Sequence, residues 1–422
     1  MTPAAWPSNR PRRRFFGEER KIVASAKTSR GAASAQHTTA LEARFRSARL
    51  LRAVLTDSGP ERLSMRAAGV ALPLVSALTL ADCANAGPTA PSGPFRLTVL
   101  QAFGTSSSPY YNGLTYQSYA YDIDPAGQVV GMAERAEPRD FYGAALWLAG
   151  GKPPVSLEAS GYVLQAAYGI NGRGQAVGVG RCGGLGNACL WEAGQLRNLG
   201  WLDYAVYDGQ SQPLAINDSG VVVGWADAAP HGFDHAVLWR DGLATDLGTL
   251  GGLQSEALDI DNAGRVVGWA RPDSADPTKR HAFLWHQGTM IDLGPLDARE
   301  SIAYAINDSG QVVGRVGGFE GSRAVLWEKG NMRFLPGSES SQAFGINNRG
   351  EVVGTYIPSG TTFHAALWRG GVRYDLNDLV GDQHLGLHWA NAINDAGQVV
   401  GFGVWKSDGR EVGFLLTPTG TR

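Results

Sequence analysis

Three histidines are the residues of this chain whose type and spacing first suggest chemistry. His235, His281 and His364 each open a His-Ala-x-Leu-Trp segment, at the same place in three copies of a sequence repeat. Imidazole is both a common metal ligand and a general base. Because one histidine per repeat spreads the three around an array, we expect packing or hydrogen-bonding histidines here and no shared metal site.

Two cysteines form the second candidate group. Cys182 and Cys189 flank a loop between two expected strands of the second repeat. A disulfide across such a hairpin is geometrically plausible, and an exported protein favours it. The alternative is a pair of free or metal-binding thiols. We predict the disulfide.

Known catalytic motifs are missing from the sequence. It contains no G-x-S-x-G nucleophile turn, no H-E-x-x-H metal motif and no phosphate-binding loop. Asp259–Gly264 (Asp-Ile-Asp-Asn-Ala-Gly) approaches a calcium loop, but Ala263 stands at a ligand position and the downstream glutamate is absent. We therefore expect no metal and no cofactor.

These residues must be positioned by a repeated element. A phrase close to Ile-Asn-x-x-Gly-x-Val-Val-Gly occurs seven times, with intervals of 40 to 47 residues. Its second glycine recurs at Gly131, Gly178, Gly224, Gly268, Gly314, Gly354 and Gly401. Each copy encodes four short strands separated by Asn/Asp/Gly turns, which is typical of a propeller blade. The sequence predicts an all-β, seven-bladed β-propeller of four-stranded antiparallel blades; an open solenoid or two smaller barrels are the alternatives.

The ends of the repeat region predict how the ring closes. The seventh copy stops after a third strand, Gly413–Leu416, whereas Phe95–Leu100 precedes the first copy as a strand without a blade. Pairing the two would complete the last blade and remove two unpaired sheet edges. We predict this closure for a domain spanning residues 95–418.

A tryptophan recurs in six of the seven copies. Because one four-stranded sheet cannot bury its apolar faces alone, we interpret these rings as packing between blades, with an aromatic ligand ladder as the alternative. They are Trp147, Trp191, Trp239, Trp285, Trp327 and Trp368.

The phrases His281–Trp285, His235–Trp239 and Asp246–Gly252 (Asp-Leu-Gly-Thr-Leu-Gly-Gly) resemble the HAF repeat family of bacterial proteins. The resemblance covers about residues 95–418. Departures from the family pattern include Arg323 and Val412 in place of the histidine and Leu416 in place of the tryptophan. The resemblance implies an exported β-rich protein and specifies no biochemical activity.

Charge divides the chain into two parts. The first 66 residues hold 14 Lys/Arg against 5 Asp/Glu, and the remainder holds 23 against 34. An acidic repeat domain argues against a nucleic-acid partner, which would require a basic face. We predict that residues 1–64 are a disordered basic extension from a misassigned start, with translation beginning at Met65.

The segment from Met65 carries the features of a signal peptide. An apolar run too short to span a bilayer ends at Ala84-Asn85-Ala86, an A-x-A cleavage pattern. We predict a signal peptide over residues 65–86, a linker over 87–94 and no transmembrane segment. The protein would be secreted, periplasmic or held at the cell surface.

Loop length localises the expected function. In an antiparallel blade, the first–second and third–fourth connections share one face of the ring, and here these are short and repetitive. The second–third loops and the links between blades share the other face and vary in length. Binding residues concentrate on such loops, and aromatic side chains there suit sugars or peptides. The candidate ligand-binding residues are Tyr110, Tyr111, Tyr116, Trp201, Tyr204, Tyr207, His384, His388 and Trp389.

Two functions remain open. The first is an exported, non-enzymatic binding propeller, expected to be a monomer, that recognises a glycan or protein through the variable loops. The alternative is a secreted propeller hydrolase or lyase acting on polysaccharide, with acids and histidines at the channel mouth. Its loop candidates are Asp140, Glu320, His231 and His384. The absence of a spaced acid pair common to these loops favours binding.

Overall fold

The computed structural model describes residues 94–103, 117–135, 142–150, 152–159, 162–182, 187–202, 209–228, 233–273, 276, 278–295, 298–318, 321–337, 339–358 and 362–420. The predicted basic extension (residues 1–64), the predicted signal peptide (65–86) and residues 87–93 of the predicted linker lie outside the described residues.

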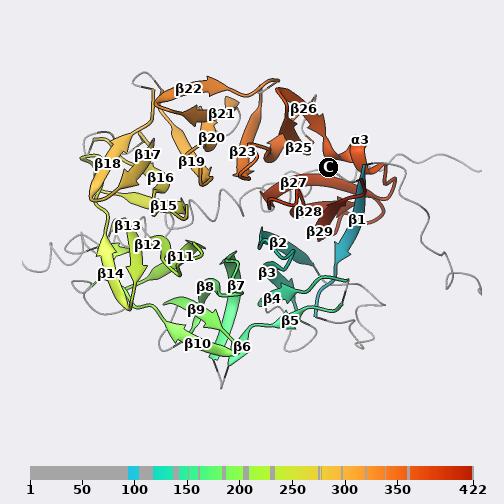
Figure 1. Cartoon of the computed structure of the whole chain (residues 1–422), viewed down its shortest axis with the longest axis horizontal. Coiled ribbons are helices and arrows are strands. Elements are labelled where there is room, and N and C mark those ends of the chain that lie inside the picture. Colours follow the sequence, from blue (N-terminus) through green and yellow to red (C-terminus); the bar gives the residue numbers. More distant parts are fainter. Residues whose placement is uncertain are drawn as a thin grey trace, which may run out of the picture. The chain divides into compact units, whose positions relative to one another are not determined.

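Seven antiparallel sheets form a ring, which confirms the seven-bladed propeller (Figure 1). First strands, nearest the centre, are β2 (Ser118–Ile123), β7 (Tyr162–Ile170), β11 (Ser211–Ile216), β15 (Ser255–Ile260), β19 (Ser301–Ile306), β23 (Ser341–Ile346) and β27 (Leu385–Ile393). Second strands are β3 (Val129–Glu134), β8 (Ala176–Arg181), β12 (Val222–Ala228), β16 (Val266–Ala270), β20 (Val312–Val316), β24 (Val352–Tyr356) and β28 (Val399–Trp405).

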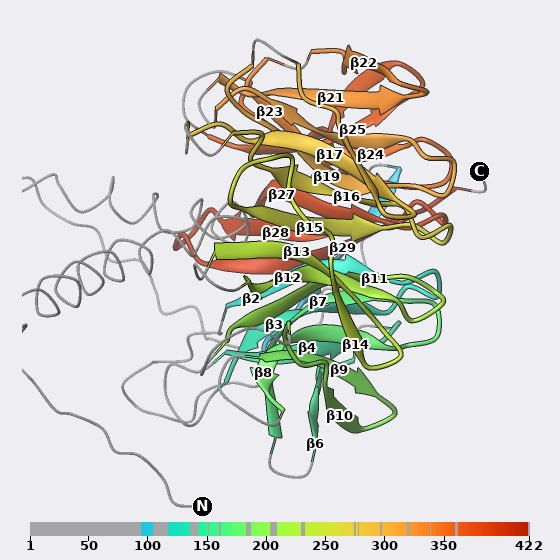
Figure 2. The ribbon, with the colours of Figure 1, turned by 90° about the vertical axis from the view of Figure 1, so that its left-hand side faces the viewer.

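Third strands are β4 (Tyr142–Trp147), β9 (Asn187–Glu192), β13 (Phe233–Arg240), β17 (His281–His286), β21 (Arg323–Glu328), β25 (His364–Arg369) and β29 (Glu411–Pro418). Outer strands are β5 (Val155–Ser156), β10 (Gln195–Asn198), β14 (Leu243–Asp246), β18 (Thr289–Asp292), β22 (Asn331–Phe334), β26 (Val372–Asp375) and β1 (Phe95–Leu100). Seen from the side, the strands run between the two faces of the ring (Figure 2).

Two elements depart from the simple repeat. β6 (Glu158–Ala159) pairs with the start of β7 and gives the second blade a fifth strand. The five-residue helix α3 (Leu376–Val380) follows the sixth blade, with the Asp375 side chain accepting a hydrogen bond from the Asn377 backbone at its start. Within the described residues, no helix has the length and apolar character needed to cross a membrane.

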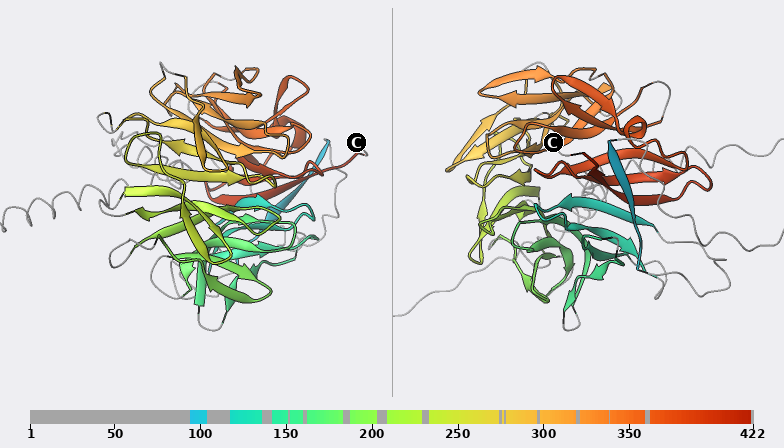
Figure 3. Two further views of the ribbon diagram at one scale, coloured as in Figure 1. Left: turned by 60° about the vertical axis from the view of Figure 1, so that its left-hand side comes forward. Right: turned by 45° about the vertical axis from the view of Figure 1, so that its right-hand side comes forward.

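The ring closes as predicted, through its first strand. β1 pairs antiparallel with β29, with Phe95 opposite Pro418 and Leu100 opposite Gly413. Phe95 and Leu100 are buried, Phe95 in the core between the sixth and seventh blades and Leu100 in the core between the seventh and first. Leu97 and Val99 are partly exposed and pack against the same core as Phe95. Figure 3 shows β1, in cyan, beside the red strands of the seventh blade.

The recurrent second glycine of the phrase lies opposite a β-bulge in the first strand of each blade. In all seven blades the pairing of the first and second strands shifts by one residue, as between Ala303 and Ala305. The bulge pushes a carbonyl oxygen against the facing glycine, so a Cβ on Gly314 would lie 1.9 Å from the Ile302 oxygen. Only a residue without a side chain fits there.

The asparagine of the phrase joins neighbouring blades. In five copies its side-chain Nδ2 donates to the backbone oxygen of the equivalent residue in the next blade, at 2.9 to 3.1 Å. The donors are Asn171, Asn217, Asn307, Asn347 and Asn394, the last of which reaches Asp124 across the closure. Asp124 and Asp261, which fill this position in the other two copies, lack an amide to donate.

The recurrent tryptophans pack between blades, as predicted. Trp239 lies in one core cluster with Val177 and Leu190 of the preceding blade. Three other rings donate their Nε1–H to a carbonyl that follows the outer strand of the preceding blade, at 2.8 to 3.0 Å: Trp147, Trp327 and Trp368. The core is thus a set of blade interfaces arranged around the ring.

Candidate functional site

More than half of the predicted ligand-binding residues lie outside the part of the chain that the structure describes. Tyr110, Tyr111, Tyr116, Tyr204 and Tyr207 lie outside the described residues. The same holds for three acids and histidines considered for the hydrolytic alternative: Asp140, His231 and Glu320.

Four predicted residues are described, and they occupy different environments. Trp201 follows β10 and is 39% exposed. His384 is exposed and precedes β27, where the Asp382 carboxylate accepts hydrogen bonds from the backbones of His384 and Leu385. His388 and Trp389 lie on β27 itself, partly buried and buried respectively. Trp201 and His384 are therefore the exposed members of the set, both on links between blades.

Trp389 belongs to a row of aromatic rings that crosses three blades. Its ring stacks on Phe402 at 4.8 Å between centroids, and Phe363 of the sixth blade lies 4.6 Å away on another side. The Phe402 ring in turn contacts the ring of Tyr119 in the first blade edge-to-face, with 5.4 Å between centroids. Trp389 is 5% exposed and acts here as a packing residue.

The row ends at a partly buried carboxyl group. The Tyr119 hydroxyl donates to Glu411, and the Tyr142 hydroxyl donates to Gln117 Oε1 at 2.8 Å. Burial raises the pKa of Glu411, with the tyrosine hydrogen bond acting in the opposite direction. The pKa of Tyr119 is also raised, by burial first and then by the nearby Glu411. A half-buried acid that holds its proton more tightly than usual can donate hydrogen bonds or protons.

A second group of titratable side chains gathers where the sixth and seventh blades meet. His364 Nδ1 lies 2.6 Å from Asp375 Oδ2, and the Tyr356 hydroxyl donates to the same oxygen at 2.9 Å. Burial and this bond raise the pKa of Tyr356 to about 12. Burial would raise the pKa of Asp375, but hydrogen bonds from His364, Asn377 and Tyr356 outweigh it and lower that pKa.

His388 completes this group from the neighbouring first strand. Burial, followed by the nearby His364, lowers its pKa from 6.5 to about 4. Its Nδ1 is shielded from solvent and has no hydrogen-bond partner among the residues that the structure describes. The imidazole is therefore neutral near pH 7 and has one nitrogen without a bond.

The histidine–aspartate contact recurs in two more blades. His235 pairs with Asp246 and His281 with Asp292, at 2.8 to 3.0 Å, as His364 does with Asp375. The aspartate also accepts a backbone N–H two residues further on in each case. All three pairs join a third strand to an outer strand, away from the first strands nearest the centre (Figure 1). This repetition indicates a structural pair.

The prediction of hydrogen-bonding histidines is confirmed, but the sequence analysis did not identify the aspartates that they bond. The available signal was a constant separation of 11 residues between histidine and aspartate in the three copies. The same spacing links the His-Ala-x-Leu-Trp segment to the Asp-Leu sequence that follows it.

Cys182 and Cys189 form a disulfide between the end of β8 and β9, with their Cα atoms 6.1 Å apart. The bond closes the loop between the second and third strands of the second blade.

In the described part of the chain, no three His, Cys, Asp or Glu side chains gather as metal ligands would. The calcium-like segment is engaged internally. Asp259 accepts the backbone N–H groups of Ile260 and Ile306, and Asp261 binds Arg265. Asp259 therefore links β15 to the fifth blade, and Asp261 stabilises the turn between β15 and β16.

No protein-family model matches the sequence, and no curated protein matches it. Several solved structures are similar in fold at low identity. YCF48 from Cyanidioschyzon merolae has 12% identity and a TM-score of 0.44, over 75% of this chain and 98% of that one. An uncomplexed acylaminoacyl peptidase from Pyrococcus horikoshii has 10% identity and a TM-score of 0.44, and the match covers 75% of this chain and 54% of the peptidase.

TolB from Acinetobacter baumannii has 11% identity and a TM-score of 0.40, over 59% of this chain and 63% of that one. The match spans about half of the peptidase and somewhat under two thirds of TolB. Likenesses at this level carry no argument about function.

Proposed function

We propose that the chain is an exported, non-enzymatic binding propeller that recognises a glycan through the face carrying the variable loops. The observation that carries the proposal is the contrast between two kinds of side chain. The histidines and aspartates of the third and outer strands are engaged in three equivalent pairs. Trp201 and His384 are exposed on links between blades instead.

An exposed indole suits a sugar ring, whose C–H face packs on an aromatic plane. The HAF-like phrases support export, as does the apolar run before Ala86. Cleavage after Ala86 would release a protein beginning at Gly87. A protein ligand is the competing outcome, since aromatic residues are also enriched where proteins bind one another.

Purified protein applied to glycan arrays and cell-wall fractions tests the proposal, with Trp201→Ala as the probing variant. Phe334 is a matched control because it is also 39% exposed but lies on the outer strand β22. Loss of glycan retention in Trp201→Ala, with retention unchanged in Phe334→Ala, is the expected result. Binding of a protein in place of any glycan would contradict the glycan assignment.

The hydrolase or lyase alternative is favoured by one observation, the raised pKa of Glu411 at the end of the aromatic row. A general acid with such a pKa could protonate a departing sugar oxygen. Release of reducing ends from polysaccharide, abolished in Glu411→Gln, would establish this activity.

A further inference from the structure

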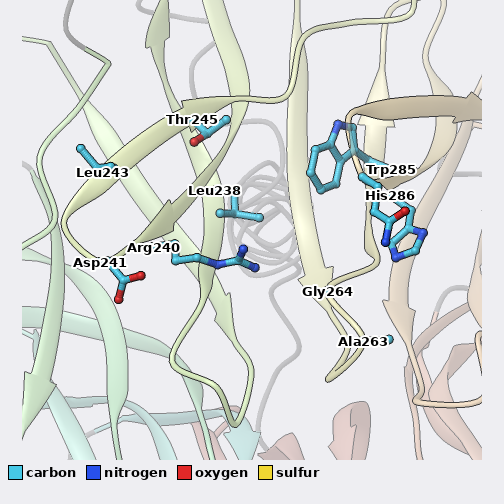
Figure 4. A pocket seen from close by; sticks show the side chains of 10 residues that line it. Leu238, Arg240, Asp241, Leu243, Thr245, Ala263, Gly264, Trp285 and His286 are labelled. Atoms are coloured by element: carbon cyan, nitrogen blue, oxygen red, sulfur yellow. The ribbon is translucent and has the colours of Figure 1, made fainter.

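The short-turn face carries a groove between the third and fourth blades. Its volume is about 470 Å³, within the range of roughly 300–1,000 Å³ typical of small-ligand sites. It is bounded by the β13–β14 turn, the β15–β16 turn and the end of β17 (Figure 4). Its lining includes Leu238, Arg240, Asp241, Thr245, Trp285 and His286.

Trp285 differs from three of the recurrent tryptophans and, like Trp191, is only partly buried. Trp147, Trp327 and Trp368 are buried and bonded to the preceding blade. Trp285 is partly exposed and makes no such bond within the described residues. Its indole packs against the core between the third and fourth blades and also lines the groove, opposite Leu238 and Thr245 (Figure 4).

The residue after the tryptophan is held in place in three other blades. Glu192 accepts a hydrogen bond from Gln175 at 2.8 Å, and Glu328 accepts one from Gln311 at 3.0 Å. In the sixth blade, Arg369 lies 3.8 Å from Glu351. In each case the partner is the residue directly after the glycine of the Ile-Asn-x-x-Gly turn.

The third and fourth blades lack this contact. The partner position of Arg240 is Val221, which has no polar side chain. The partner position of His286 is Arg265, which bonds instead to Asp261 and to the backbone oxygen of Asp308. No hydrogen bond or ion pair within the described part of the chain engages the Arg240 or His286 side chain, and both line the groove.

We propose that this groove binds a carboxylate-bearing sugar unit, of the uronic acid class. The Trp285 ring supplies a flat apolar surface for the sugar C–H face. The Arg240 guanidinium, which Figure 4 shows extending into the groove, matches a carboxylate in two parallel hydrogen bonds. His286 and Thr245 offer further bonds to hydroxyls.

Asp241 selects among anionic ligands. Its carboxylate, in the same turn as Arg240, accepts hydroxyl hydrogens of a sugar and repels a doubly charged phosphate. The net negative charge of the chain after residue 66 likewise disfavours polyanions such as nucleic acid. A uronic acid unit, with one singly charged carboxylate among several hydroxyls, fits both conditions better than a phosphate or a nucleic acid.

This site lies on the face opposite the variable loops, so it does not depend on the glycan site proposed above. Titration calorimetry of the full chain with digalacturonate and with neutral galactobiose tests it. We expect digalacturonate to bind at least about tenfold more tightly, the factor a charge-assisted hydrogen bond supplies. Arg240→Gln should remove that preference, and Trp285→Phe should weaken both sugars.

Arg369→Gln is the matched control, since Arg369 holds the same position in the sixth blade but is engaged by Glu351; its binding should equal that of the parent. Equal affinity for the two sugars overturns the role of Arg240. Loss of digalacturonate binding in Trp201→Ala, with Arg240→Gln unaffected, overturns the location. Tighter binding of ADP than of digalacturonate overturns the ligand class.

Discussion

His388 is a partly buried imidazole close to the imidazole of His364, and its protonation should govern part of the stability at acid pH. Its pKa of about 4 lies below the ordinary 6.5, so the unfolded chain binds more protons than the folded one between these values. The free energy of unfolding should therefore fall as pH decreases from about 6.5 to about 4, by on the order of 2–3 kcal/mol from this residue.

Urea denaturation of the parent and of His388→Gln at pH 7 and pH 4 measures the effect. The variant should lose less stability between the two pH values, while Glu411, present in both proteins, cancels from the comparison. His384→Gln is the control, because His384 is exposed and should leave the parent pH dependence unchanged. Identical pH dependence in parent and His388→Gln would refute the argument.

The glycine facing each bulge gives a second prediction for single residues. Gly314→Ala should lower the free energy of unfolding by about 3 kcal/mol or more, because the new methyl group meets the Ile302 oxygen at 1.9 Å. Gly318→Ala is the control, since no atom lies within 4 Å of its Cβ position. Thermal denaturation compares the two variants; equal melting temperatures would contradict the steric explanation.

Single residues were predictable from the sequence where the repeat imposed them, and unpredictable where partners came from elsewhere. The recurrence of Gly314 and its equivalents marked a position that admits no side chain. The bond from Asn394 to Asp124 could not be foreseen, because it joins residues 270 apart through the ring. The environment of His388 likewise depends on His364, which another blade supplies.

At the scale of one element, the loop between β8 and β9 carries the disulfide. Cys182 and Cys189 should be bonded in protein recovered from an oxidising compartment, and the double variant Cys182→Ser/Cys189→Ser should be less stable by about 1–3 kcal/mol. The effect is modest because the closed loop is short. Thiol labelling under native conditions checks the bond; stoichiometric labelling of both cysteines would contradict it.

Strands and turns followed from local patterns, which is why each blade could be assigned in advance. Alternating apolar residues and Asn/Asp/Gly turns are local signals. β6 and α3 were not foreseen. β6 is two residues long and exists through its pairing with β7. α3 is one short turn stabilised by the Asp375 cap, too brief for a helical period to show.

The closure strand β1 should contribute more to the stability of the folded ring than its short length suggests. Deleting residues 87–101 removes β1, exposes the edge of β29 and eliminates the burial of Phe95 and Leu100. At about 1.5–3 kcal/mol per buried side chain, the loss approaches the 5–15 kcal/mol stability typical of a domain. The product should be aggregated or sensitive to protease.

Deleting residues 87–93 leaves β1 intact and should not change the melting temperature. Limited proteolysis and thermal denaturation distinguish the two deletions. A longer deletion that melts with the parent would show that the ring does not depend on this strand.

The closed ring was predictable because the sequence has an extra strand before the first repeat and lacks a fourth strand in the seventh. The groove between the third and fourth blades was not, since short repetitive turns gave no sign of a binding surface. It arises from two substitutions relative to the repeat, Val221 and Arg265, whose effect appears only when neighbouring blades are set side by side.

The pairing of β1 with β29 also imposes an order on folding. Six blades draw all their strands from consecutive chain, so each can form soon after its residues are available. The seventh joins segments more than 300 residues apart, and contacts at such sequence separation form slowly. Completion of the ring should therefore be the last and slowest step of folding. Until then, the free edges of β1 and β29 are the segments that a chaperone would need to cover.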